Sequence, residues 1–477
     1  MVAGLSRSSL FSPSFLFGVA SSSLQVEGGA SEGGRGNGIW NSFASIPGKI
    51  TDGTTPDVTC DFFHKYEEDI LEMKRLGINT YRFSISWPRL FPESSRELNL
   101  EGVAFYNNVI DCLVKAGVAP FVTLYHWDLP QYLQDDLEIK GWLRNDIIQH
   151  FLVFVDACFT LFGDRVKHWI TINEIHMGTV VCCELEMFPP GNSVKGMSDS
   201  YVVAHNLLLA HAAAVKLYRT KYQVNQQGSI GMVADVQWYE PLSDIQEDRD
   251  AVLRCIEFNM GWILDPVFFG DYPTMMREIL GEKLPKFTKE QSEDLKGSMD
   301  FLGLNYYFAL WVTKAAKIKP LGMHTWLPES QTNLFWVNAD GKLLGEAEGP
   351  YESAMFRSCP WGLRKVLASL SSRYGNIPIY ITENGIKDSV IVRTLDERLN
   401  DQWRVKFLQD HIQALSESIR EDKVNVKGYF HWSFTDTWEW FSGYAPHFGL
   451  YYIDFEDPQL HRTPKASARW FASFLKS

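Results

Sequence analysis

Apolar runs and amphipathic segments alternate along most of this 477-residue chain. The short runs of aliphatic, β-branched and aromatic residues predict strands that are buried on both faces, and apolar residues at helical spacing predict helices between them. Gly77, Gly117 and Gly163 close three of the predicted helices. We predict strands at 15–25, 80–87, 121–127, 169–173, 229–236, 301–307, 377–382 and 426–433, and helices at 64–76, 105–116, 146–162 and near 204–218.

Eight strands with intervening helices are compatible with a closed parallel barrel or with a doubly wound open sheet. Polar or aromatic residues end many of the predicted strands, and convergence of so many strand tips on one site favours the barrel. The sequence contains no internal repeat and no linker. We therefore expect one α/β domain over 1–477, a (β/α)8 barrel with long βα loops. The strand-end residues are Gln25, His126, Trp127, Asn173, Glu174, Asn305, Tyr306, Tyr307, Glu383 and Trp432.

The segment from Ala309 to Arg357 has little periodicity and is too long for a simple turn. Loops of this length are usually functional covers, and we expect the same here.

Composition excludes several classes of function. The net charge of −13 argues against a nucleic-acid surface, and no stretch is long and apolar enough to span a membrane. The seven cysteines are irregularly spaced without a C-x-x-C pair, which argues against a zinc or redox site. No metal or nucleotide motif occurs, so no cofactor is expected. The missing Asn-x-Ser/Thr sequon and the polar N-terminus favour a reducing, cytoplasmic location.

Two glutamates follow apolar strand-like runs. Glu174 ends the run Thr171-Ile172-Asn173-Glu174, and Glu383 stands in Ile381-Thr382-Glu383-Asn384. A single glutamate is usually a solvated surface residue. A pair at two strand tips of one barrel is instead suited to cleaving a glycosidic bond, which needs one protonated carboxyl and one ionised carboxylate, about 5 Å apart in a retaining enzyme.

Neighbouring polar residues fit supporting roles in that chemistry. Asn173 is suited to bind a sugar 2-hydroxyl, and Tyr307 to hold a carboxylate with its hydroxyl group. Arg82 is either part of a structural salt bridge or the cation that keeps a nucleophile ionised. Gln25, His126 and Glu439 supply donors and acceptors for sugar hydroxyls, although a lone histidine near aromatic residues more often belongs to the core.

Aromatic residues cluster late in the chain, beside polar groups. Indole faces suit the C–H face of a sugar ring, and Trp432 is the candidate floor of the site, although clustering alone more often indicates core. The cluster consists of Trp432, Trp438, Trp440, Phe441, Tyr444 and Phe448.

These residues, with the motifs around them, resemble those of family 1 glycoside hydrolases, most closely the plant-type β-glucosidases. The resemblance rests on motifs in the same order along nearly the whole chain. Besides the two glutamate motifs, these are Phe15-Leu16-Phe17-Gly18-Val19-Ala20, Tyr81-Arg82-Phe83-Ser84, Leu124-Tyr125-His126-Trp127-Asp128, Trp432-Ser433, Trp438-Glu439-Trp440 and Phe448-Gly449.

The resemblance implies a (β/α)8 barrel, a small-molecule β-glycoside substrate and a two-step mechanism with Glu174 as acid/base and Glu383 as nucleophile. Arg82 and Tyr307 would flank the nucleophile. A carboxylate at 439 is unlike the serine of 6-phospho-glycosidases and would repel a phosphate. The residues expected to bind substrate are Gln25, His126, Trp127, Asn173, Asn305, Tyr307, Trp432, Glu439, Trp440 and Phe448.

The chain departs from the family pattern at several positions. Ile175 replaces the proline that usually follows the acid/base, and Thr437 and His447 replace an asparagine and an arginine. The tryptophan that walls the aglycone site aligns with Met355, a more adaptable residue.

Three functions remain open from the sequence. The leading one is hydrolysis of terminal β-D-glucosyl residues. The same glycosyl-enzyme could instead transfer glucose to an alcohol, or the barrel could bind sugar without cleaving it. The sequence leaves open whether the protein is a monomer or a homo-oligomer.

Overall fold

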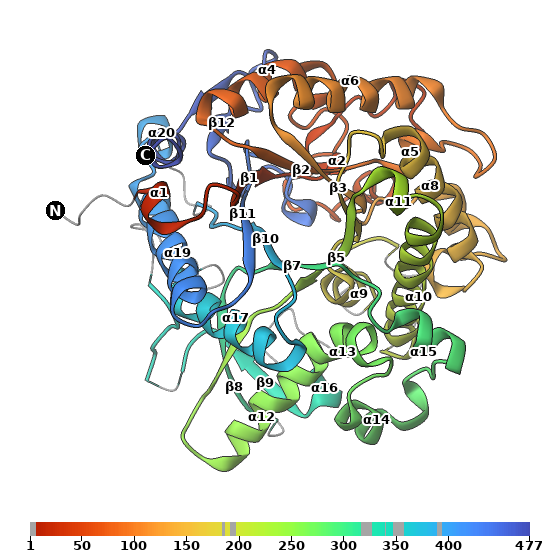
Figure 1. The fold of residues 1–477 in the computed structure, drawn as a ribbon, viewed down its shortest axis with the longest axis vertical. Helices are drawn as coiled ribbons and strands as arrows, with labels where there is room; N and C mark the ends of the chain where they lie inside the picture. The colour runs from red at the N-terminus through yellow and green to blue at the C-terminus, as the bar shows by residue number, and fades with distance from the viewer. Residues whose placement is uncertain are drawn as a thin grey trace.

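A closed barrel of eight parallel strands forms the centre of the computed structural model (Figure 1). The structure describes residues 6–183, 187–190, 197–315, 327–338, 340–346, 357–388 and 394–477. Around the barrel the strand order is β1-β11-β10-β7-β5-β4-β3-β2, which confirms the predicted (β/α)8 architecture. The barrel strands are β1 (Leu16–Ala20), β2 (Thr80–Ser84), β3 (Ala119–Tyr125), β4 (His168–Ile172), β5 (Ser229–Asp235), β7 (Phe301–Asn305), β10 (Ile379–Asn384) and β11 (Val426–Trp432).

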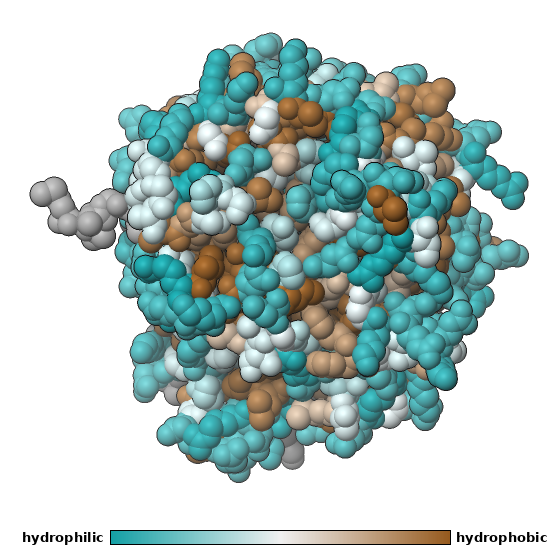
Figure 2. Space-filling model, viewed as in Figure 1, coloured by the Kyte–Doolittle hydropathy of each residue, from teal (hydrophilic) through white to brown (hydrophobic). Residues whose placement is uncertain are grey.

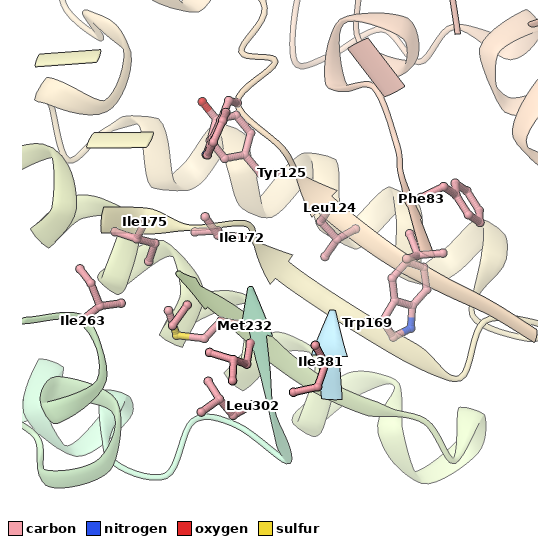
Figure 3. Close-up of a cluster of buried hydrophobic side chains, with 14 of the residues drawn as sticks. Phe83, Leu124, Tyr125, Trp169, Ile172, Ile175, Met232, Ile263, Leu302 and Ile381 are labelled. Carbon is pink, nitrogen blue, oxygen red and sulfur yellow. The ribbon is translucent and has the colours of Figure 1, made fainter. Parts of the chain in front are cut away.

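Two separate apolar clusters stabilise the barrel. Because side chains alternate along a strand, one set points into the barrel and the next set points toward the helices. The inner set forms a small cluster that includes Phe121, Ile170, Val233, Phe301 and Phe430, all at most 1% exposed. The outer set joins the main core, and Figure 3 shows part of it: Phe83, Leu124, Trp169, Met232, Leu302 and Ile381.

Helices surround the barrel, and most of the long helices pack against one another in two runs (Figure 1). The contacts run from α20 through α4, α6 and α8 to α10, and from α17 through α19 back to α20. The helices are α1 (Arg7–Leu10), α2 (Ser23–Val26), α3 (Ile39–Ala44), α4 (Phe62–Leu76), α5 (Trp87–Leu90), α6 (Leu100–Ala116), α7 (Gln131–Asp135), α8 (Ile147–Phe162), α9 (Ile175–Cys183), α10 (Met197–Lys221), α11 (Gln223–Gln226), α12 (Gln246–Ile256), α13 (Trp262–Phe269), α14 (Thr274–Leu280), α15 (Lys289–Leu295), α16 (Leu327–Ser330), α17 (Pro360–Tyr374), α18 (Leu395–Leu399), α19 (Gln402–Arg420) and α20 (Ala466–Leu475).

The outline of the molecule is mainly hydrophilic, and hydrophobic residues gather toward the middle of the face in Figure 2. Among the helices that the structure describes, none is both long and apolar enough to cross a membrane.

The predicted strands are all present, but several end earlier than expected. The first predicted strand, 15–25, is too long: β1 stops at Ala20, and Gln25 lies on the one-turn helix α2. The chain leaves the ladder here because the Ser84 hydroxyl accepts a hydrogen bond from the Ser23 amide at 2.7 Å. The second, 80–87, is also too long, since Trp87 begins α5 with Pro88 in its first turn.

The expectation of a loop over 309–357 is wrong for its described parts, which contain two strands, and its role as a cover stays a prediction. Within it, β8 (Ala309–Lys314) and β9 (Thr332–Phe335) pair antiparallel, and β6 (Trp238–Pro241) pairs with β8 to complete a three-stranded sheet. A second small ladder joins β12 (Tyr451–Ile453) to β13 (Arg462–Pro464). These strands are three to six residues long, so each is too short to give a clear period in the sequence.

Candidate active site

A pocket of about 190 Å³ opens where the barrel strands end. Its walls come from the chain that follows β1, β3, β4, β5, β7, β10 and β11. Polar side chains from many strands therefore reach one volume, as a barrel allows. The predicted residues that line it are Gln25, His126, Trp127, Asn173, Glu174, Tyr307, Glu383, Trp432, Glu439, Trp440 and Phe448.

Glu383 lies near the end of β10 and is held by two donors. The Arg82 guanidinium, fully buried on β2, forms an ion pair with Oε1, and the Tyr307 hydroxyl donates to Oε2 at 2.6 Å. Both donors favour the ionised carboxylate. The backbone is fixed as well, since the Cβ of any larger residue at Gly385 would lie 2.0 Å from the Trp432 carbonyl oxygen.

Arg82 also organises the neighbouring strand. Its Nη2 donates to Asn173 Oδ1 at 2.6 Å, which fixes the orientation of the Asn173 amide. The Asn173 Nδ2 therefore donates to His126 Nε2, at 3.1 Å. Burial, and then Arg82, hold the pKa of His126 well below its usual range, so this ring is neutral. Asn173 is thus presented to the pocket in one orientation.

Glu174 has different partners from Glu383. Its Oε1 accepts a hydrogen bond from Asn305 Nδ2 at 2.5 Å, and Asn305 is in turn held by the Thr382 hydroxyl at 2.7 Å. Asn305, which was expected to bind substrate, is not among the residues that line the cavity, and its hydrogen bond orients Glu174 instead. Burial raises the pKa of Glu174 well above its usual range, and the carboxylates of Glu383 and Asp235 raise it further. The site therefore favours a protonated Glu174 beside an ionised Glu383.

Three non-glycine residues of the pocket have left-handed backbones: Trp127, Glu174 and Trp440, with φ of 67°, 44° and 56°. Each such residue costs about 1–3 kcal/mol and persists where the surrounding structure holds it. At Glu174 the amide donates to Val233 on β5 at 3.0 Å, and α9 begins at the next residue. The left-handed turn thus aims Glu174 across the pocket before the helix starts.

The far end of the pocket combines an indole with a carboxylate. Trp432 Nε1 and the Thr437 hydroxyl both donate to Glu439 Oε1, at 3.4 and 2.5 Å. Burial raises the pKa of Glu439 to about 7. Gln25 lies alongside, with Nε2 donating to the Trp438 carbonyl at 3.0 Å. Flat apolar faces beside fixed polar atoms suit a pyranose ring.

Aromatic rings form a continuous wall beside this end. Trp440 is stacked with His126 at 5.9 Å between ring centroids and packs against Trp127 at 4.9 Å. Phe448 contacts Tyr307 edge-on at 6.3 Å. These contacts fix the width of the pocket without placing charge along the wall.

Ile175, which departs from the family pattern, does not line this pocket. It is 1% exposed and borders a neighbouring cavity of about 60 Å³, behind Glu174. Its side chain therefore packs behind Glu174 rather than beside a substrate. Met355, the expected aglycone wall, lies outside the described residues.

Several further residues line the pocket that were not expected there from the sequence. The charged and amide side chains among them are Asp235, which ends β5, Gln237, which lies just after β5, and Lys387, which follows β10, while Phe441 belongs to the late aromatic cluster. The others are Met177, Val181, Phe188, Phe308, Ser442 and Pro446. Asp235 fell inside a predicted strand, and its exposure to a pocket could have been inferred only from its position at that strand's end. Lys387 is half-buried and its charge lowers the pKa of Glu439 against the effect of burial. Within the described residues no group of histidine, cysteine and carboxylate side chains could hold a metal ion.

Comparison with known proteins agrees with this geometry. The family model for glycosyl hydrolase family 1 matches residues 7–477. The chain belongs to glycosyl hydrolase family 1. It is 44% identical to β-glucosidase 42 of Arabidopsis thaliana, over 98% of this chain and 94% of that protein. It is also 44% identical to furcatin hydrolase of Viburnum furcatum, over 98% of this chain and 86% of that protein.

Solved structures of family 1 proteins superimpose closely. A mutant rice β-glucosidase, described as a covalent complex with glucose, has a TM-score of 0.94 at 41% identity, with 99% of this chain and 100% of that chain covered. A family 1 β-glucosidase from Humicola insolens in complex with glucose has a TM-score of 0.91 at 36% identity, with 99% of each chain covered. The chain is accordingly a glycoside hydrolase.

Proposed function

We propose that this protein is a retaining β-glucosidase that removes terminal β-D-glucosyl residues from small β-glucosides. The observation that carries the proposal is the pair of buried glutamates in one pocket. Glu383 is paired with a guanidinium and a phenol, and Glu174 with a neutral amide. Such different surroundings give two carboxyl groups the two protonation states that the reaction requires.

In the first step, Glu383 attacks the anomeric carbon while Glu174 gives its proton to the leaving oxygen. The bond from the anomeric carbon to Glu383 forms as the glycosidic bond breaks. Because the negative charge of Glu383 is then lost, the electrostatic effect that kept Glu174 protonated becomes weaker.

In the second step, Glu174 accepts a proton from water, and the hydroxide oxygen displaces Glu383 from the anomeric carbon. Two inversions leave the β-configuration unchanged. The names of the relatives favour hydrolysis over transfer to an alcohol or binding without cleavage.

Substrate contacts follow from the positions in the pocket. Asn173 is oriented to bind the 2-hydroxyl next to the reacting carbon. Trp432 forms the floor, and Gln25, His126 and Glu439 bind the remaining hydroxyls. Trp127, Trp440, Tyr307 and Phe448 complete the walls. The cytoplasmic location expected from the sequence stays a prediction.

The decisive experiment uses nitrophenyl β-glucoside and two variants. Wild-type protein should release nitrophenol. Glu383→Gly should lose activity, and azide should restore turnover with an α-glucosyl azide as product. Glu174→Gly should retain turnover of activated leaving groups, and azide should give the β-glucosyl azide. Glu278→Ala, a change at an exposed residue of α14, should behave like wild type.

Either of two outcomes would contradict the proposal. Folded wild-type protein without turnover between mildly acidic and mildly alkaline pH would indicate a sugar-binding protein. The opposite stereochemistry of the two azide products would mean that the roles of Glu174 and Glu383 are exchanged.

A further inference from the structure

Asp235 is a third buried carboxylate in the pocket, and the reaction described above gives it no role. It ends β5, is 4% exposed and lines the same cavity as Glu174 and Glu383. The presence of a buried acidic residue in a sugar site calls for an explanation, because burial of a carboxylate is costly unless it is hydrogen-bonded.

The side chain is held by α9, the helix that begins immediately after Glu174. The His176 ring nitrogen Nδ1 donates to Asp235 Oδ2 at 2.8 Å, and the Met177 amide donates to Oδ1 at 3.3 Å. Asn259 Nδ2 donates to the Asp235 carbonyl oxygen at 3.2 Å. Asp235 therefore ties the first turn of α9 to the end of β5.

Strand register places Asp235 beside Glu174. Strands β4 and β5 pair in parallel with Ile170 opposite Gly231, and the Glu174 amide donates to the Val233 carbonyl at 3.0 Å. Glu174 and Asp235 each lie four residues beyond this pair, so the two residues reach the pocket at the same level. The two carboxyl groups thus belong to adjacent strand ends and line the same pocket.

We propose that Asp235 is a positioning residue for Glu174. The carboxyl group of Asp235 is bonded to the first turn of α9, and from the adjacent strand end it keeps the acid/base protonated and aimed at the leaving oxygen. The inference rests on the proposed function of Glu174. Two carboxyl groups thus act on the acid. Glu383 loses its charge when it is glycosylated, whereas Asp235 takes part in no bond change of either step.

The charged and titratable groups around Glu174 support this assignment. Glu383 on β10 and Asp235 on β5 raise its pKa, after the effect of burial, and Arg82 on β2 lowers it. Tyr307, after β7, is kept as a neutral phenol because burial raises its pKa well above the usual range. On α9, His176 contacts Asp235 directly. Asp235 is therefore the second carboxyl group acting on Glu174, and it takes part in no bond change.

A pH profile tests the role of the charge. The alkaline limb of kcat/KM reports loss of the proton from the general acid in the free enzyme. For Asp235→Asn we expect this limb to move to lower pH by about one unit, since a like charge has been removed. Asp248→Asn is the matched control: it neutralises another buried aspartate, hydrogen-bonded to Ser243 and Thr313, and should leave the limb in place.

Leaving groups give a second readout. Alkyl β-glucosides need a proton from the acid, whereas dinitrophenyl β-glucoside does not. At pH 8, Asp235→Asn should therefore lose about tenfold in kcat/KM on alkyl glucosides and change little on the dinitrophenyl substrate. Asp235→Glu, which keeps the charge, should retain the wild-type limb.

Failure of this inference can be distinguished from failure of the proposed function. Equal losses on both substrates with an unmoved limb would reduce Asp235 to a structural anchor of α9 and overturn the inference. The azide products of the Glu174 and Glu383 variants would be unaffected by that result. If Asp235→Asn does not fold, Asp235→Ser removes the same charge with a smaller side chain, and the same comparison applies.

Discussion

The two glutamates of the pocket lie on different sides of it and have partners of opposite kinds. On the β2–β7–β10 side, Glu383 contacts a buried guanidinium and a phenol hydroxyl. On the β4–β5 side, Glu174 contacts a carboxamide and lies near Asp235. Both glutamates are at most 5% exposed, so burial alone cannot distinguish them.

This difference indicates that the charge of its partners determines whether a glutamate of this pocket serves as nucleophile or as acid/base. A buried carboxylate beside a cation stays ionised, and one beside neutral donors and other carboxylates keeps its proton. Asn173 connects the two sides, since its Oδ1 accepts from Arg82 at 2.6 Å and from Asn305 at 3.3 Å. The network therefore fixes both glutamates relative to each other as well as separately.

Removing the cation should have the largest effect on this asymmetry. Arg82→Met leaves Glu383 buried without its ion-pair partner and also releases Asn173. Breaking a buried ion pair costs about 3–5 kcal/mol, so we expect kcat/KM on nitrophenyl β-glucoside to fall roughly 10²–10⁴-fold.

Arg82→Lys is the matched control for that variant. It keeps the charge but cannot bond Glu383, Asn173 and the Thr382 carbonyl together, so it should recover only part of the activity. Circular dichroism would establish that both variants fold. Full activity of a folded Arg82→Met protein would show that the nucleophile does not depend on its cation.

Removing the phenol hydroxyl should have a smaller effect on the same side. Tyr307→Phe deletes the hydrogen bond to Glu383 Oε2 and leaves the ion pair with Arg82 intact. A hydrogen bond to a charged group contributes about 1.5–3 kcal/mol, so kcat/KM should fall roughly 10–100-fold. Steady-state kinetics would measure this decrease. Tyr380→Phe, which removes another tyrosine hydroxyl inside the barrel, is the matched control. A decrease as large as that of Arg82→Met would contradict the ranking of the two donors.

The barrel and the glutamate pair could be predicted from the sequence because their signals are local. Each barrel strand is a short apolar run, and each glutamate follows such a run within two residues. The left-handed backbone of Glu174 carries no comparable signal, because it depends on the Val233 carbonyl and on the start of α9. The predicted ends of the first two strands were wrong by several residues, because the Ser23 amide donates to the Ser84 hydroxyl after β1 and because α5 begins at Trp87 after β2.

Contacts between distant parts of the chain could not be predicted in this way. The bond between Asn305 and Glu174 joins residues 131 positions apart, and the one between Arg82 and Glu383 spans 301. Lys387 had no signal because a lysine in a loop is usually solvated, and only the fold brings it toward Glu439. The expectation of one domain over the whole chain stays a prediction.

Glu439 is a third carboxyl group of the pocket, and replacing it should have the smallest effect of the three changes. Burial raises its pKa to about 7, and the hydrogen bonds from Thr437 and Trp432, and then the charge of Lys387, act in the opposite direction. As the pH rises through about 7, the carboxyl loses its proton and becomes a stronger acceptor for sugar hydroxyls. Glu439→Gln should therefore raise KM about tenfold at pH 8 and much less at pH 6, where wild-type Glu439 is protonated and resembles the amide. In wild type, KM should fall as the pH rises from 6 to 8, and in the variant it should stay level. A variant whose KM keeps the wild-type dependence on pH would show that another group, and not Glu439, titrates in the sugar pocket.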